Sequence, residues 1–165
     1  MHGSSLLLVE HALATYCLDR PHPAIVLDVG SLDVNGTYKH LFAGDDYIGC
    51  DLVGGPNVTV ILDPDKPYKL PFEACQFDLV VCGQVLEHSP MPWLIVQEMK
   101  RVLKPGGYII LVAPSAGPRH FTPDCWRLTD AGMRGLADWA GLWIVYCETV
   151  DALPWNDTIA VMVKR

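Results

Sequence analysis

The sequence lacks the features of three classes of protein. It has no run of five or more Lys and Arg residues, and its net charge is −7, so no clustered cations are available for a nucleic-acid backbone. No apolar stretch reaches the roughly eighteen residues that a membrane span needs. The first ten residues have neither the charged start nor the small-residue cleavage site of a secretion signal. We therefore expect a cytoplasmic protein that binds neither nucleic acid nor membrane.

The cysteines lack the spacing of a zinc or redox site. Six of them are scattered along the chain with no C-x-x-C pair. Several stand inside apolar runs, as buried free thiols do, which fits a reducing compartment. We therefore expect no metal. Half of the 165 residues are apolar and no repeat or linker is visible, so residues 1–165 are expected to form one domain.

Short apolar runs separated by turn residues predict an α/β protein. Continuous runs of this kind suit strands that helices cover on both faces. The predicted strands are residues 24–29, 47–51, 58–62, 77–82, 108–113, 142–149 and 158–164. The predicted helices are residues 4–18, residues 92–103 before a Lys-Pro-Gly-Gly stop, and a third that Thr129 caps and Gly141 closes.

A glycine-bearing turn and an acid are the most informative pair of features. The first predicted strand runs into a turn with Gly30 and Gly36, and the second ends at Asp51. In nucleotide-binding α/β folds, such a turn lets backbone approach the ligand, and such an acid accepts hydrogen bonds from ribose hydroxyls. The pair predicts a cofactor that contains adenosine. The turn alone would also fit an ordinary strand-to-helix connection.

The composition of the turn argues against a pyrophosphate. Neither the dinucleotide pattern G-x-G-x-x-G nor the phosphate loop G-x-x-x-x-G-K fits the spacing of the glycines. Asp28 and Asp33 also place negative charge where phosphates would lie. A nicotinamide-linked oxidoreductase is therefore the weaker alternative.

Two downstream motifs complete a resemblance to a known family. Residues 77–88 read F-D-L-V-V-C-G-Q-V-L-E-H, and residues 101–114 read R-V-L-K-P-G-G-Y-I-I-L-V-A-P. With V-L-D-V-G-S and Y-I-G-C-D, they resemble class I S-adenosylmethionine-dependent methyltransferases over residues 24–114. One departure is that Leu32 and Val34 stand where such enzymes usually have the second and third glycines of G-x-G-x-G.

The resemblance implies a Rossmann-like fold. It is a seven-stranded, mostly parallel sheet with helices on both faces and an antiparallel last strand. The connection at residues 52–57 is too short for an ordinary parallel crossover, and by itself it favours a hairpin. The family implies that the second and third strands are nevertheless parallel, with the usual helix deleted.

The resemblance also implies S-adenosylmethionine as the cofactor, and motif positions name its contacts. The turn residues should surround the methionine portion, Asp51 should bind the ribose, and Asp63 should accept from the adenine amine. The alternatives are that Asp63 is a turn residue before Pro64 and that Gln84 is a polar group at a helix edge. The full set is Asp28, Gly30, Asp33, Asn35, Gly36, Asp51, Leu52, Asp63, Gly83 and Gln84.

His88 and His120 are the candidate catalytic bases. Both follow strands whose ends should face the acceptor, and an imidazole titrates in the right range. A structural histidine hydrogen-bonded to backbone is the alternative for His88. The stretch H-F-T-P-D-C-W-R-L-T, residues 120–129, resembles a segment of methyltransferases found among bacterial glycan and secondary-metabolite genes.

In that stretch, Trp126 and Arg127 are candidates for binding a small-molecule acceptor by stacking and by pairing with a carboxylate. Alternatively, Trp126 packs into the core and Arg127 ties the loop to an acid. Because the chain is short, we expect the opening helix and residues 120–127 to cover the cofactor, or a homodimer to complete the pocket. A catalytically silent, methyltransferase-like binding module is the alternative to an active enzyme.

Overall fold

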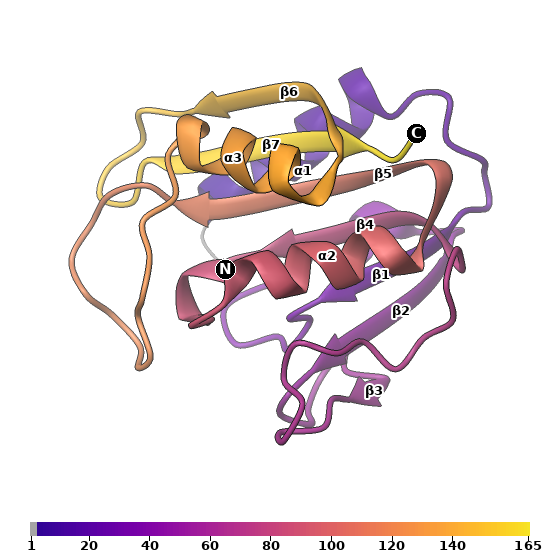
Figure 1. Cartoon of the computed structure of the whole chain (residues 1–165), viewed down its shortest axis with the longest axis horizontal. Coiled ribbons are helices and arrows are strands. Elements are labelled where there is room, and N and C mark those ends of the chain that lie inside the picture. Colours follow the sequence, from indigo (N-terminus) through magenta and orange to yellow (C-terminus); the bar gives the residue numbers. More distant parts are fainter. Residues whose placement is uncertain (1–2) are drawn as a thin grey trace.

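The computed structural model describes residues 3–165 and contains a seven-stranded sheet in the order β3-β2-β1-β4-β5-β7-β6 (Figure 1). Strands β1 to β5 pair in parallel, and β7 runs antiparallel to both of its neighbours. This arrangement confirms the fold predicted from the family resemblance. The strands are β1 (Ile25–Val29), β2 (Asp46–Asp51), β3 (Val60–Ile61), β4 (Phe77–Gly83), β5 (Leu103–Pro114), β6 (Trp143–Thr149) and β7 (Asp157–Val163).

Helices cover both faces of the sheet. Helix α1 (Gly3–Tyr16) packs on one face, and α2 (Pro92–Val102) and α3 (Asp130–Ala140) pack on the other (Figure 1). Two short 3-10 helices, η1 (Lys39–Phe42) and η2 (Leu86–His88), lie in connections. Successive residues of a strand point to opposite faces, so Val26 joins the core under α1 while Leu27 joins the core under α2 and α3. No helix in the described part of the chain is long and apolar enough to span a membrane.

The capping of α3 follows the prediction. The Thr129 hydroxyl accepts a hydrogen bond from Gly132 N at 3.4 Å, and Gly141 closes the helix with φ 66°. The end of α2 differs from the prediction. The helix stops at Val102, and Lys-Pro-Gly-Gly belongs to β5 because Leu103 already pairs with Phe77. The fifth strand is therefore longer than its apolar run.

Strand β3 pairs in parallel with β2, which confirms the arrangement inferred from the family and excludes the hairpin. Only Val60 and Ile61 form it, opposite Cys50 and Asp51. The connection returns to the start of β3 without a helix and is fixed there by two hydrogen bonds between Gly49 and Thr59. Because β3 pairs only with the last two residues of β2, the chain has to travel back only a short distance, and a loop is sufficient in place of a crossover helix.

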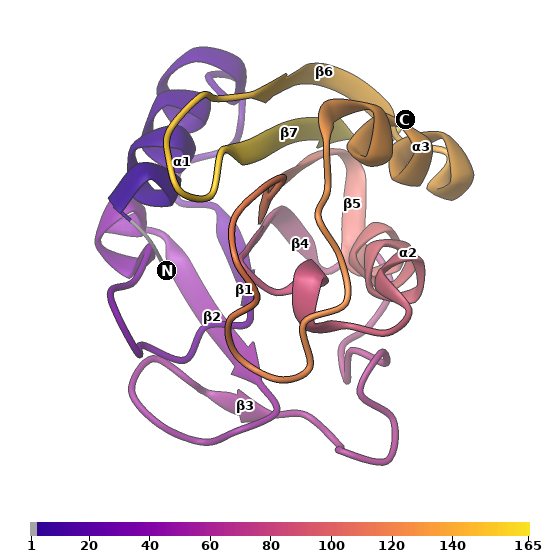
Figure 2. The same ribbon diagram turned by 90° about the vertical axis from the view of Figure 1, so that its left-hand side faces the viewer.

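The parallel strands end at one edge of the sheet, and β7 begins there because it runs in the opposite direction. Figure 2 views this edge, with the connection of residues 115–129, in orange, looping in front of the ends of the central strands. Side chains from distant parts of the sequence meet here, as is general for ligand sites of α/β folds.

Candidate functional site

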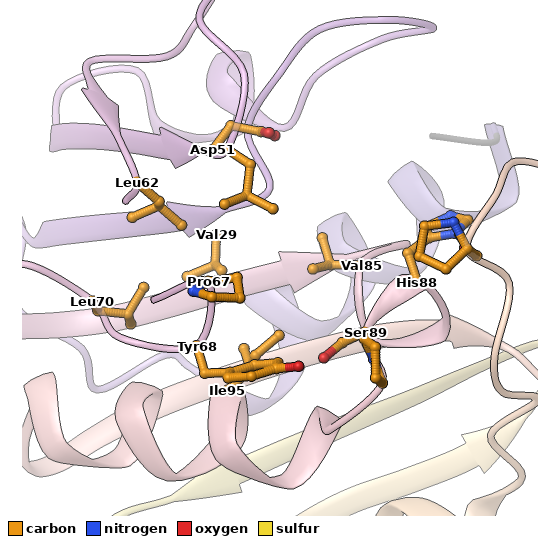
Figure 3. A pocket seen from close by; sticks show the side chains of 13 residues that line it. Val29, Asp51, Leu62, Pro67, Tyr68, Leu70, Val85, His88, Ser89 and Ile95 are labelled. Carbon is orange, nitrogen blue, oxygen red and sulfur yellow. The ribbon is translucent and has the colours of Figure 1, made fainter. Parts of the chain in front are cut away.

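A cavity of about 230 Å³ lies at the edge where the parallel strands end. Its walls come from the ends of β1 and β2, from the segment after β3, and from η2 and α2 (Figure 3). Val29, Leu62, Leu70 and Ile95 give it an apolar lining, and Asp51 adds a carboxylate. An apolar slot with one carboxylate suits a flat ring that carries hydroxyl groups.

Backbone amides orient the Asp51 carboxylate. Leu32 N donates to Oδ2 and Val53 N donates to Oδ1, each at 3.2 Å. Each carboxylate oxygen has a second lone pair, so the group keeps acceptor capacity for a ligand. Of the ten cofactor residues predicted from the sequence, Asp51 and Leu52 line the cavity.

The turn after β1 depends on Gly30. Its φ is +81°, and a Cβ there would lie 2.1 Å from Cγ2 of Val85, which lines the cavity. Gly30 is therefore needed both for its conformation and for the close approach of the turn to the segment after β4. Farther along, Asp33 Oδ1 accepts from Gly36 N at 2.8 Å, and Asn35 and Gly36 are exposed. These three residues do not line the cavity.

A second, polar cluster lies on the α1 side of the sheet and consists of Asp28, Tyr38, Gln84 and Asp157. The Tyr47 hydroxyl donates to Asp28 Oδ2 at 2.5 Å. Asp157 accepts from Gln84 Nε2 at 2.9 Å and from the Ser4 hydroxyl at 2.8 Å, and Tyr38 bonds to the Ser5 hydroxyl. The cluster therefore joins the end of β1, the end of β4, the start of β7 and the first turn of α1.

The polar cluster has an excess of buried acceptors. Asp28 and Asp157 are both buried, and Asp28 Oδ1 and Gln84 Oε1 have no hydrogen-bond partner among the described residues. Burial raises the pKa of Asp28 to about 7, against the hydrogen bond from Tyr47, which lowers it. Such a site favours a cationic ligand group, because a cation would satisfy the free oxygens and offset the cost of burying charge.

Gly83 and Gln84 face this polar cluster. A Cβ at Gly83 would lie 2.0 Å from the Tyr38 hydroxyl. Gln84 has φ 60°, a left-handed conformation that costs about 1 kcal/mol or more in a non-glycine residue. The backbone N–H of Gln84 donates to Val112 O at 2.8 Å, and this bond holds the strained conformation. Strain of this kind is concentrated at functional sites.

Asp63 lies in a turn and does not line the cavity. It is exposed, its Oδ1 accepts from Asp65 N at 2.9 Å, and its Oδ2 lies 4.0 Å from Lys66 Nζ. This geometry matches the turn-residue alternative. Leu62 and Tyr68 line the cavity on either side of that turn instead.

The two predicted bases come together with Glu87 at the end of the cavity that His88 lines. The His88 and His120 ring centroids are 5.0 Å apart, and His88 Nε2 lies 3.7 Å from Glu87 Oε1. Glu87 is fully buried, neither of its oxygens has a hydrogen-bond partner among the described residues, and burial raises its pKa to about 8. We define Glu87, His88 and His120 as the histidine cluster.

The loop that carries His120 is tied to η2. His88 Nδ1 donates to Pro123 O at 2.7 Å, Cys125 N donates to Glu87 O at 2.7 Å, and Trp126 Nε1 donates to Ser89 O at 2.8 Å. These bonds place residues 120–127 over the end of β4 (Figure 2). Helix α1, by contrast, contributes Val9 and Ala12 to the core, and only its first turn reaches the polar cluster.

Arg127 is used within the loop. It pairs with both oxygens of Asp124, at 2.5 and 2.9 Å, and donates to Pro118 O. The hydrogen bonds from Arg127 hold the pKa of Asp124 well below its usual range. The rings of Trp126 and Trp93 pack edge to face, with their centroids 6.2 Å apart. The geometry of Arg127 matches the architectural alternative. Trp126 is 38% exposed, so it does not pack into the core, and its hydrogen bond to Ser89 O ties the loop to the segment after η2.

Sequence reasoning missed Tyr38, Tyr68 and Asp157. No motif marks them. Asp157 had one available signal, since a last strand that runs antiparallel must begin at the edge where the parallel strands end. An acid at its first position therefore lies next to the predicted site.

The comparisons with known proteins agree with this arrangement. The family model described as a methyltransferase domain matches residues 27–111, which include the turn after β1, Asp51 and the segment after β4. The chain belongs to this family. An uncharacterized methyltransferase of Mycobacterium leprae is 45% identical over 102 residues, covering 55% of this chain. The match spans 37% of that relative's length, so the chain corresponds to well under half of it.

Two solved structures share the methyltransferase fold. A putative methyltransferase of Haloferax volcanii, in complex with the Trm112 activator, has a TM-score of 0.72 and 17% identity, covering 97% of this chain and 90% of that one. A 1,6-didemethyltoxoflavin-N1-methyltransferase of Burkholderia thailandensis, with S-adenosylhomocysteine bound, has a TM-score of 0.71 and 17% identity, covering 98% and 86%. At this identity the likeness extends to the fold alone.

Proposed function

We propose that this protein is an S-adenosylmethionine-dependent methyltransferase that acts on a small-molecule acceptor. The observation that carries the proposal is the position of Asp51, fixed by two backbone amides at the rim of an apolar cavity, in a chain that belongs to the methyltransferase family. The ribose hydroxyls of the cofactor would bind this carboxylate, and the adenine would lie against the apolar lining.

The polar cluster supports the same cofactor. S-adenosylmethionine carries an ammonium group and a sulfonium, and Asp28, Gln84 and Asp157 present buried oxygens with unused acceptor capacity. A pyrophosphate would meet these acids with like charge. The cluster therefore disfavours a nicotinamide dinucleotide at this position.

The acceptor would enter beside the histidine cluster. When bound, the cofactor supplies an activated methyl group, so the protein must mainly orient the acceptor, exclude water and take up a proton. His88 has Nδ1 bonded to Pro123 O, which leaves its Nε2 as a proton acceptor. His120 lies next to it and is the second candidate. Residues 120–127 cover this end, which restricts access and favours a small acceptor.

Binding and turnover separate the alternatives. Calorimetric titration of the whole chain with S-adenosylhomocysteine and with NADH should show binding of the first alone. Transfer of labelled methyl groups to a panel of phenols, sugars and carboxylic acids then tests catalysis. Tight binding of NADH without S-adenosylhomocysteine would refute the proposal, and binding without transfer to any acceptor would favour the silent module. Ultracentrifugation with and without cofactor tests the homodimer.

A further inference from the structure

We propose that Glu87, His88 and His120 form a binding site for a divalent transition-metal ion, with Zn²⁺ as the ion to test. In the described part of the chain, one potential ligand atom from each of these residues lies within 4.8 Å of the other two. Two imidazoles and one carboxylate form a common ligand set of zinc sites that keep one coordination position open.

The side-chain lone pairs that accept no hydrogen bond indicate a site for a cation. Glu87 is fully buried, and neither of its carboxylate oxygens has a hydrogen-bond partner among residues 3–165. An unpaired buried carboxylate is costly, so it requires a proton or a positive charge. His88 Nε2 is 3.7 Å from Glu87 Oε1, too far for a hydrogen bond and suitable for two ligands of one ion.

The second ring nitrogen of His88 has the kind of partner that metal-binding histidines need. Metal-ligating imidazoles usually donate their second N–H to a backbone carbonyl or a carboxylate, which fixes the ring orientation. His88 Nδ1 lies 2.7 Å from Pro123 O. Because a carbonyl only accepts, the proton is on Nδ1, and Nε2 of the neutral ring has a free lone pair. His120 Nδ1 lies 3.3 Å from Asp124 Oδ2 but makes no hydrogen bond in this geometry, so this nitrogen is still free for a ligand.

The cluster needs only a small adjustment to bind an ion. Ligand atoms on tetrahedral zinc, with bonds of about 2.1 Å, are separated by about 3.4 Å. The spread of up to 4.8 Å is wider, and a rotation of His120 would reduce it. The His120 side chain is 27% exposed and belongs to the 115–129 connection, so it can move more easily than Glu87.

The position of the site suggests its use. His88 and Pro123 also line the cavity assigned to the cofactor. An oxygen of the acceptor could therefore take the open coordination position close to the methyl group. With an ion bound, the His88 Nε2 lone pair would be used for coordination, so the ion, in place of a histidine base, would promote loss of the acceptor's proton. This use depends on the proposed function, whereas metal binding itself does not.

The test is a titration of the intact chain, stripped with a chelator, with ZnCl₂ in a calorimeter, and with Co²⁺ followed by its visible absorption. We expect one ion per chain and the absorption bands of a low-symmetry Co²⁺ site. Glu87→Gln and His120→Gln should each weaken binding by more than about 100-fold, because each removes a direct ligand. His40→Gln, which changes an exposed histidine on η1, is the matched control and should bind as the wild type does.

Equal affinity for all four proteins, or no binding by the wild type, would overturn the proposal and leave a metal-free histidine pair. Circular dichroism checks folding. If Glu87→Gln does not fold, His120→Gln decides, because His120 lies in a surface loop. S-adenosylhomocysteine binding is measured separately on the stripped wild type. Loss of zinc binding with intact cofactor binding overturns the metal site alone, and the reverse result overturns the proposed function alone.

Discussion

Replacing Asp28 with Asn should change how the stability of the protein depends on pH. Asp28 is buried, and burial raises the pKa of its carboxyl from 3.8 to about 7. The native state therefore keeps a proton on Asp28 in a range where the unfolded state has released it. The stabilisation is complete below the unfolded pKa and is lost as the pH rises through the folded pKa.

The magnitude follows from the size of the shift. Each pH unit between the two pKa values is worth 1.36 kcal/mol, so wild-type unfolding free energy should fall by at most about 4 kcal/mol between pH 4 and pH 8 on account of this group. Asp28→Asn removes that fall. The exchange of a carboxyl oxygen for NH₂ also adds a cost of about 1–3 kcal/mol that is independent of pH, because it disturbs the hydrogen bond with Tyr47.

Urea unfolding of wild type and variant without cofactor, at several pH values from 4 to 8, measures this effect. The difference between the two proteins cancels the contributions of the other titrating groups. We expect the variant to be less stable at pH 4 and to gain several kcal/mol relative to wild type by pH 8. Asp65→Asn, at an exposed carboxyl, should show no such gain. A difference that stays constant across this range would refute the argument for the polar cluster.

Three further predictions concern the cofactor and the loop. Asp51→Ala should weaken S-adenosylhomocysteine binding in calorimetry by more than tenfold. The substitution removes two hydrogen bonds between the ribose hydroxyls and a charged carboxylate, worth about 1.5–3 kcal/mol each. An unchanged affinity would show that Asp51 is not part of the site. Gly30→Ala should lower the free energy of unfolding in urea by about 1–3 kcal/mol, because the added Cβ would lie 2.1 Å from Val85. Gly135→Ala is the control and should be neutral or stabilising, because a Cβ there has no atom within 4 Å. Trp126→Phe removes the bond to Ser89 O, worth about 1 kcal/mol, and should speed proteolysis within residues 115–129; equal cleavage rates would show that this bond does not hold the loop.

The sequence predicted the parts of the fold that depend on local pattern. Strand positions followed from apolar runs, and the capping of α3 followed from Thr129 and Gly141. The parallel pairing of β3 did not follow from local rules, because a loop of this length favours a hairpin. It came from the family resemblance, and the structure shows that a strand of two residues makes the short connection possible.

The site was predictable where one residue determines it and not where several segments meet. Asp51 follows directly from its place at the end of a strand. The role of Arg127 depended on Asp124, three residues away, and only the geometry shows that their bond uses the guanidinium. The expectation of no metal came from cysteine spacing, which cannot detect a cluster that joins η2 to a residue more than thirty positions later.

The strand order also constrains how this protein can be made. Strand β6 has β7 as its strand neighbour, and β7 separates it from β5. During synthesis, residues 143–149 therefore emerge before the strand to which they must pair. The same last segment carries Asp157 into the polar cluster. A ribosome-bound chain that ends before residue 157 would contain α1, α2, α3 and strands β1 to β6, but β6 would have no strand to pair with and the polar cluster would lack Asp157.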